Sequence, residues 1–182
     1  MTERDLQLGI VAHWRSSLVV AVPNYTPAGW WECDVWGVTK AGYWVEWECK
    51  LSREDLRADA TKRKERMIAP GKPRGKWTRE IRVKYEVITT DHRGPSRFWY
   101  VVPDELEIQP EEVPPWAGLA TATKAHGGWI AISCVKLAPD LGRRKTSPRE
   151  IRLAERRMWY RYWNCLKVMN KLGVAEPIEE PA

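Results

Sequence analysis

The sequence offers little for zinc binding or for disulfide bonds. It holds four cysteines and three histidines among 182 residues. The cysteines, at positions 33, 49, 134 and 165, show no C-x-x-C spacing and no neighbouring pair of histidines, which the common structural zinc sites require. We therefore expect reduced thiols and no zinc site.

Segments that would direct the chain to a membrane are also missing. The first residues, MTERDLQLGI, lack the basic and then apolar order of a signal peptide. No apolar run approaches the roughly 20 residues that a membrane-spanning helix needs. The G-x-S-x-G motif of serine hydrolases and a recognisable Cys–His pair are absent as well. We predict a cytoplasmic protein with no membrane partner and no serine or cysteine nucleophile.

Positive charge and tryptophan are abundant instead. The formal net charge is +6, the pI is about 9.2, and twelve Trp stand against one Phe. A basic balance favours a polyanionic partner such as DNA, although many basic proteins bind no nucleic acid. We assign most tryptophans to the core and leave a few to stack on bases. The length predicts one domain over residues 1–172, followed by a disordered tail over 173–182.

Two strand-like runs in the first third of the chain form a predicted β-hairpin. They cover residues 31–38 and 43–50, and a short turn with Gly42 joins them. Both runs are rich in Trp and Val, which favour strands. The hairpin is the element around which we expect the rest of the domain to be organised.

Acidic side chains gather on one face of this hairpin. Because strand side chains alternate between faces, Glu32 and Asp34 share a face of the first strand, and Glu46, Glu48 and Lys50 share a face of the second. Pairing the strands would bring Asp34, Glu48 and Lys50 together. Crowded carboxylates repel one another unless a cation lies between them, and oxygen ligands suit Mg²⁺ or Mn²⁺.

The order Asp34, then Glu48-Cys49-Lys50, resembles the PD-(D/E)XK, or restriction-endonuclease-like, nucleases. The segments VEWECKLSREDLRAD, RFWYVVPDEL and VPPWAGLATA are similar to the MmcB-type DNA-repair nucleases and their small phage relatives. The resemblance covers roughly residues 32–163, with an apparent insertion over about 67–95. Cys49 stands where the family has an aliphatic residue, and Cys33 replaces the proline that often precedes the first acid.

This resemblance implies an α/β (α+β) fold with a mixed central sheet flanked by helices, in the order α-β-β-β-α-β. It also implies a bacterial or phage-infected cell as the setting, and hydrolysis of DNA that leaves a 5′-phosphate. The carboxylates of Asp34 and Glu48 and the main-chain carbonyl of Cys49 would bind Mg²⁺. Lys50 would orient or deprotonate the attacking water, and Glu32 would hold a second metal through water.

A helix is expected directly after the hairpin, from Ser52 to about Ile68, because Ser-Arg-Glu-Asp has the spacing of a capping box. Asp55 and Asp59 lie on one side of this helix. They would support the metal ligands, as similar acids do in the family, or belong to an ordinary solvated face.

The following segment is dense in cations and ends in a predicted strand over residues 81–87. We interpret it as a DNA-binding arm, and the alternative is a solubilising loop beside an edge strand. Its candidate phosphate contacts are Lys62, Lys72, Arg74, Lys76, Arg82 and Lys84.

The remaining expected elements are a helix over residues 2–17, strands over 18–22, 98–102, 116–121 and 129–135, and a helix that begins at Ser147 and ends at Gly173. The last helix carries an apolar stripe that predicts ordinary core packing. Its flank with Arg149, Arg152 and Arg156 faces either DNA or water.

The leading hypothesis is thus a Mg²⁺-dependent DNA endonuclease with Asp34, Glu48 and Lys50 as catalytic residues. The alternative is a non-catalytic nucleic-acid-binding or scaffold protein on a nuclease fold. That alternative predicts broken catalytic residues, whereas all three are intact. The sequence leaves open whether the protein forms a homodimer.

Overall fold

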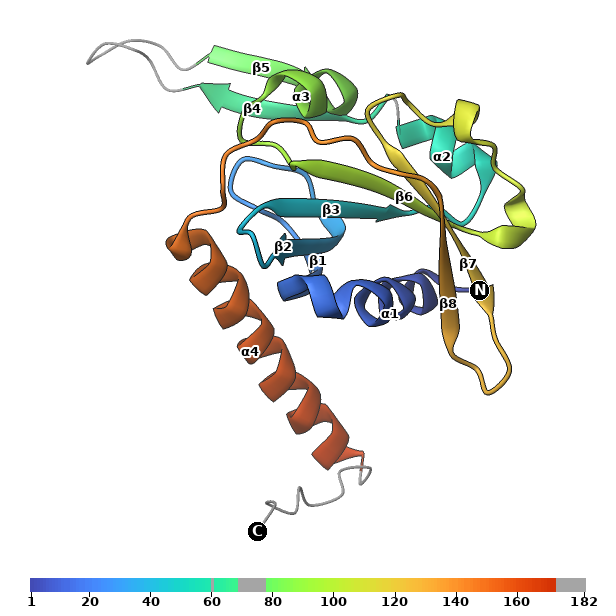
Figure 1. Cartoon of the computed structure of the whole chain (residues 1–182). Coiled ribbons are helices and arrows are strands. Elements are labelled where there is room, and N and C mark those ends of the chain that lie inside the picture. Colours follow the sequence, from blue (N-terminus) through green and yellow to red (C-terminus); the bar gives the residue numbers. More distant parts are fainter. Residues whose placement is uncertain (60, 69–77, 173–182) are drawn as a thin grey trace. The chain divides into compact units, whose positions relative to one another are not determined.

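The computed structural model describes residues 1–59, 61–68 and 78–172 (Figure 1). Contacts divide the chain into two compact units, residues 1–146 and a second unit that begins at Ser147. The predicted tail over 173–182 and the predicted phosphate contacts Lys72, Arg74 and Lys76 lie outside the described residues. The prediction of a single domain over 1–172 stays a prediction.

The first unit is built on a six-stranded mixed sheet with the order β1-β2-β3-β6-β7-β8. Strands β1, β2 and β3 form an antiparallel meander, β3, β6 and β7 run parallel, and β8 is antiparallel to β7. The strands are β1 Leu18–Tyr25, β2 Cys33–Thr39, β3 Trp44–Cys49, β6 Arg97–Pro103, β7 Gly118–Lys124 and β8 Ile130–Lys136. Helices flank this sheet, so the predicted α+β fold class is confirmed.

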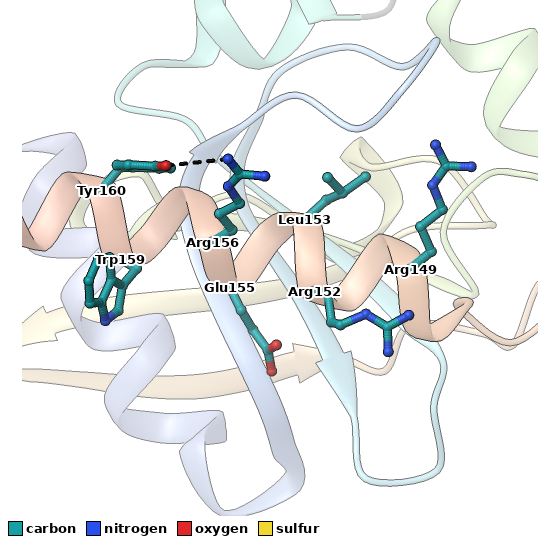
Figure 2. A pocket seen from close by; sticks show the side chains of 7 residues that line it. All are labelled: Arg149, Arg152, Leu153, Glu155, Arg156, Trp159 and Tyr160. Carbon is teal, nitrogen blue, oxygen red and sulfur yellow. Dashed lines mark hydrogen bonds between the residues drawn. The ribbon is translucent and has the colours of Figure 1, made fainter.

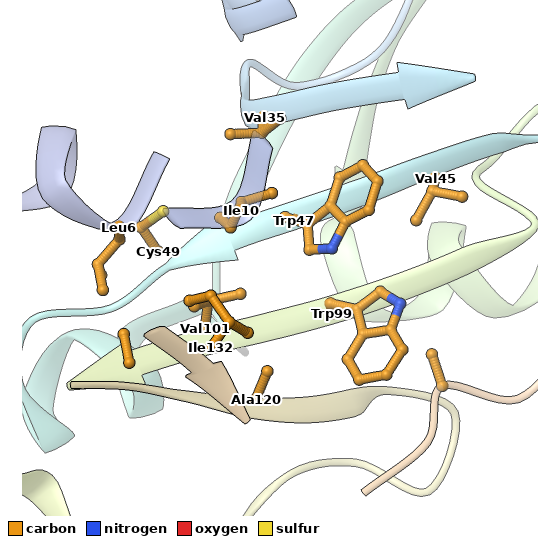
Figure 3. Packing of buried hydrophobic residues seen from close by; sticks show 12 residues of the cluster. Leu6, Ile10, Val35, Val45, Trp47, Cys49, Trp99, Val101, Ala120 and Ile132 are labelled. Carbon is orange, nitrogen blue, oxygen red and sulfur yellow. The ribbon is translucent and has the colours of Figure 1, made fainter. Parts of the chain in front are cut away.

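Helix α1 (Glu3–Trp14) covers one face of the sheet. Thr2 and Asp5 form a capping box at its start, as Thr and an acid three residues later favour. Leu6 and Ile10 are fully buried in the main hydrophobic cluster, to which the sheet contributes Trp47 and Trp99 (Figure 3). The predicted first helix is therefore confirmed. Short 3₁₀ helices follow at Arg15–Ser17, Asp104–Leu106 and Pro110–Glu112.

The central hairpin forms as the alternating pattern predicts. β2 and β3 pair in the register Val35 to Trp47 and Trp36 to Glu46. The turn is closed by the amide of Thr39, which donates to the Tyr43 carbonyl, and Gly42 adopts a φ of +89° that other residues rarely take.

Two predictions between residues 52 and 90 are wrong. Helix α2 covers only Arg53–Asp59, and the chain then enters β4 (Arg63–Ile68), which pairs antiparallel with β5 (Thr78–Val83). The expected strand over 81–87 likewise ends at Val83, and helix α3 (Lys84–Thr90) follows. Pairing of β4 with β5 overrode the local helix preference after Asp59. After Val83, burial of Lys84, Val87 and Ile88 on one side favours a helix.

The second unit contains helix α4 (Pro148–Lys171). Ser147 accepts a hydrogen bond from the Glu150 amide and completes a capping box, which confirms the predicted start. Along its apolar stripe Ala154 is buried whereas Tyr162 and Cys165 are exposed, and the predicted core packing stays a prediction. Among the described residues, no helix is long and apolar enough to cross a membrane.

Candidate active site

Strand β3 places the predicted acids and lysine on the face of the sheet opposite α1. Val45, Trp47 and Cys49 belong to the cluster that α1 covers. The intervening residues therefore point to the other face. Glu48 and Lys50 are 1% and 2% exposed, so they lie inside the protein rather than on its surface.

Glu48 is surrounded by three ammonium groups. Its carboxylate oxygens lie 3.0 Å from Lys50 Nζ, 2.6 Å from Lys84 Nζ and 3.5 Å from Lys62 Nζ. Burial alone would raise the pKa of Glu48, but Lys84 and Lys50 outweigh this effect and hold the pKa below its usual value. Glu48 is therefore an anion that three cations share.

Asp59, at the end of α2, belongs to the same cluster. It is fully buried, and its carboxylate lies 3.1 Å from Lys50 Nζ and 2.9 Å from Lys62 Nζ. The hydroxyl of Tyr100 on β6 donates to it at 2.7 Å. Burial would raise the pKa of Asp59, but Lys84, Lys50 and Lys62 together lower it. The sequence predicted a supporting role for Asp59, and the structure brings it into direct contact with Lys50.

Lys84 is placed differently from the prediction. It was expected on an exposed DNA-binding arm, but its side chain is fully buried. Its ammonium lies 2.6 Å from Glu48, 3.4 Å from Glu46 and 3.8 Å from Asp59. Burial would lower the pKa of Lys84, yet these acids raise it. The prediction failed because β5 ends at Val83, and the turn into α3 directs Lys84 into the sheet rather than along an arm.

Glu46 completes the cluster and was not among the predicted site residues. Trp30 donates its indole N–H to this carboxylate at 2.7 Å, and Lys84 lies on its other side. Burial, supported by the charge of Glu48, raises its pKa to about 8, so Glu46 holds a proton near neutral pH. The alternation that places Glu48 and Lys50 on one face was the signal that could have identified Glu46.

Asp34 lies beside the main chain of β3. Its carboxylate accepts a hydrogen bond from the Cys49 amide at 2.7 Å. Burial first, and the charge of Glu48 second, raise the pKa of Asp34 to about 7. Asp34 is thus next to residues 48–50, as the hairpin predicted, and its anionic form has too little compensating positive charge.

Three other predicted site residues, Glu32, Asp55 and Arg82, lie outside the cluster, whereas Lys62 belongs to it. Glu32 and Asp55 are exposed, and in the described part of the chain neither pairs with a cluster residue. Arg82 is only 12% exposed and binds Asp91 at 2.5 Å, which leaves little of its guanidinium for a phosphate. Lys62 is 43% exposed and links the cluster to solvent.

The tyrosines of the cluster could not be read from the sequence. Tyr100 stands in a continuous apolar strand without alternation, and it also lies 3.1 Å from the hydroxyl of Tyr85 on α3. Burial raises the pKa of Tyr100, so its hydroxyl stays protonated and acts as a donor. Nothing local marks it as a polar contact.

Asp34 and Glu48 are the residues of this site that could hold a metal ion. The described residues contain no group of three or more His, Cys, Asp or Glu arranged to hold a metal. Mg²⁺, however, is often bound by one or two carboxylates together with substrate phosphates. Asp34, with its raised pKa, and Glu48 are two such oxygen donors. Any ion on Glu48 has to compete with the Lys84 ammonium at 2.6 Å.

Comparisons with known proteins give the fold but no function. No protein-family model and no curated protein matches the chain. Among solved structures, the chain is similar to SPO1766, a protein of unknown function from Silicibacter pomeroyi. The two are 21% identical with a TM-score of 0.58, and the similarity covers 98% of each chain. At this level of identity the similarity supports the six-stranded α+β architecture alone.

Proposed function

We propose that this protein is a metal-dependent DNA endonuclease with Asp34, Glu48 and Lys50 in its active site. The observation that carries the proposal is that Asp34 on β2 binds the main chain of Cys49, the residue between Glu48 and Lys50. Asp34 binds the Cys49 amide at 2.7 Å, and Lys50 Nζ binds Glu48 at 3.0 Å. The order α1, β1, β2, β3, α2 and β6 supports a restriction-endonuclease-like core.

Asp34, Glu48 and the Cys49 carbonyl would hold Mg²⁺ or Mn²⁺. The bound ion supplies a water of lowered pKa and neutralises charge that builds on the scissile phosphate. The chain's contribution is to keep two carboxylates close together in a buried place. Burial, and after it the charge of Glu48, raise the pKa of Asp34, so its anion is disfavoured without a cation nearby; a perturbed pKa of this kind is typical of functional sites and supports the proposal.

Lys50 acts as a fixed positive charge rather than as a base. Burial would lower its pKa, but Glu48 and Asp59 more than reverse this and raise it. A lysine that stays protonated cannot remove a proton from water, so its role is to orient the attacking group and to stabilise charge on the phosphate. Tyr100, which hydrogen-bonds Asp59, keeps in place the acid that holds Lys50.

Access to the cluster requires a local rearrangement. Glu48 and Lys50 are almost fully buried, and Lys84 fills the space between Glu46, Glu48 and Asp59. Substrate therefore reaches Lys50 only when the segment that carries Lys84 moves away. Lys62, the most exposed ammonium of the cluster, is the first that a phosphate would meet.

The position of Lys84 also favours a second candidate, a nucleic-acid-binding protein without catalysis. A lysine that occupies a carboxylate cluster can replace a metal ion and stabilise the fold in its place. On this hypothesis the protein binds DNA but does not cleave it at any concentration of Mg²⁺ or Mn²⁺.

The deciding experiment incubates the purified protein with supercoiled, linear and single-stranded DNA, with Mg²⁺, Mn²⁺ or EDTA. We expect cleavage that needs the metal and that falls roughly 10²–10³-fold in Lys50→Ala, because one electrostatic stabiliser is lost. Binding should stay within a few-fold. Lys40→Ala, an exposed lysine at the hairpin turn, is the matched control and should cleave normally.

Because Lys50 is buried between two acids, its variant has to be checked for folding by thermal denaturation. Asp34→Asn, which keeps an acceptor for the Cys49 amide, provides a second, folded variant that should lose cleavage. Cleavage by both variants at the wild-type rate would remove this site from the mechanism. Intact DNA binding with no cleavage by the wild type would favour the non-catalytic candidate.

A further inference from the structure

Helix α4 is strongly basic. Its 24 residues include seven Lys or Arg and two Glu, a net charge of +5 out of +6 for the whole chain. A polyanion would therefore be attracted to this helix.

Three of the seven cations of α4 lie within one arc of the helix together with its two tryptophans. Arg149, Arg152, Arg156, Trp159 and Trp163 follow one another at spacings of three and four, and they form what we call the Arg–Trp face. With 3.6 residues in each turn, such spacings align side chains in a row. The row spans about 21 Å at a rise of 1.5 Å per residue.

The side chains of this face are exposed and organised. Trp159 is 61% exposed and Trp163 is 44% exposed, and their rings meet edge to face with centroids 5.4 Å apart. Arg156 donates to the Tyr160 hydroxyl at 3.3 Å, and its guanidinium lies 5.6 Å from the ring centre (Figure 2). Arg149 and Arg152 extend from the helix in different directions (Figure 2), and both line the same pocket.

We propose that the Arg–Trp face binds single-stranded DNA. Arginines attract the phosphates, and tryptophan rings stack on bases, a combination that single-strand-binding proteins use. Only unpaired bases offer a free face to Trp159 and Trp163, because in a duplex each base is already stacked. This inference rests on the proposed function, and it names single-stranded DNA as the substrate form that the nuclease engages.

The arrangement differs from that of a helix that lies on a membrane. Such a helix separates its cations from its apolar and aromatic residues, which occupy opposite sides. On α4 three arginines are followed along one arc by two tryptophans, and the side chains of Ile151, Met158 and Met169 lie outside this arc. Charge and aromatic rings on one side match a nucleic acid strand, whose phosphates and bases are also neighbours.

The test measures binding of the full-length protein to a labelled oligothymidylate of about 20 nucleotides, longer than the site of roughly 4–16 nucleotides typical of one binding fold. Fluorescence anisotropy in EDTA separates binding from any cleavage. Each lost stacking contact should weaken binding roughly 5- to 150-fold in Trp159→Ala or Trp163→Ala. In the double variant Arg152→Ala with Arg156→Ala, the slope of log affinity against log salt concentration should become shallower by up to about 1.4, because two phosphate contacts are lost.

Matched controls identify the face. Trp129→Ala removes a tryptophan ring of similar exposure, 62%, from the first unit and should bind within a few-fold of wild type. Trp159→Phe should restore most of the binding, since a ring remains. Circular dichroism confirms that each variant keeps its helix content.

Wild-type affinity in the Trp159→Ala, Trp163→Ala double variant would overturn the proposal. Duplex DNA that bound as tightly as the single strand would also overturn the proposal. So would phosphatidylserine vesicles that bound more tightly and displaced the labelled oligonucleotide. Lys50→Ala should bind the oligonucleotide normally. Failure of cleavage in the wild type, with intact binding through α4, would count against the nuclease and leave this inference standing.

Discussion

Replacing Lys84 with methionine tests whether the buried cluster depends on a balance of charges. Methionine keeps most of the side-chain volume, so the substitution removes the ammonium and little packing. The ammonium lies 2.6 Å from Glu48 and is fully buried. Removing one partner of a buried ion pair costs about 3–5 kcal/mol. Because Lys50 and Lys62 still contact Glu48, we expect the lower end, about 3 kcal/mol.

Lys62→Met is the matched control. Like Lys84, Lys62 contacts Glu48 and Asp59, at 3.5 Å and 2.9 Å, but its side chain is 43% exposed. Water screens such a pair, and its loss should cost no more than about 1 kcal/mol. Urea denaturation at pH 7 without metal measures both variants. In thermal melts, Lys84→Met should unfold roughly 6–12 °C below wild type.

A divalent ion should partly replace the lost ammonium. Without Lys84, one carboxylate oxygen of Glu48 loses its nearest cation. Mn²⁺ should therefore stabilise Lys84→Met more than it stabilises the wild-type protein. Equal stability of the Lys84 and Lys62 variants would refute the idea of a charge-balanced cluster. Equal effects of Mn²⁺ on Lys84→Met and on wild type would show that Lys84 does not compete with a cation.

Two further substitutions follow from the pKa of Asp34 and from the hydrogen bond of Tyr100. Because the folded pKa of Asp34 is about 7, raised from 3.8, its contribution to stability is complete below about pH 4 and is lost as the pH rises through 7. Asp34→Asn, measured by denaturation in EDTA, should match wild type near pH 4 and be more stable by roughly 1–4 kcal/mol at pH 8; a constant difference at both pH values would contradict the assignment. Tyr100→Phe removes a donor 2.7 Å from the buried Asp59 and should cost about 1.5–3 kcal/mol in urea denaturation, and a change below about 0.5 kcal/mol would show that this contact is not a hydrogen bond to a charge.

Local patterns predicted the elements whose structure is decided locally. The alternation around Asp34 and Glu48 and the glycine turn at Gly42 predicted the central hairpin, and Thr2 and Ser147 marked two helix starts. These signals lie within a few residues of the elements they describe. They required no knowledge of the rest of the fold.

Local patterns did not predict the structure of the segment between Asp59 and Thr90. The helix expected to run to Ile68 ends at Asp59, because β4 pairs with β5, and the register of that pair cannot be read from either strand alone. Strand alternation was also assumed to continue past Val83, where a helix begins instead.

The sequence by itself determined which charged side chains of the second hairpin strand share a face, because strand alternation places Glu46, Glu48 and Lys50 together. Only the tertiary structure decided what those charges meet. Lys84 reaches Glu48 across 36 positions of the chain, and Tyr100 reaches Asp59 across 41. Burial then sets their protonation, since the same carboxyl group has a lowered pKa in Glu48 and a raised one in Glu46. The pKa of a buried carboxyl group depends on desolvation and on charged partners that are distant in the sequence. The order of residues along the chain shows neither.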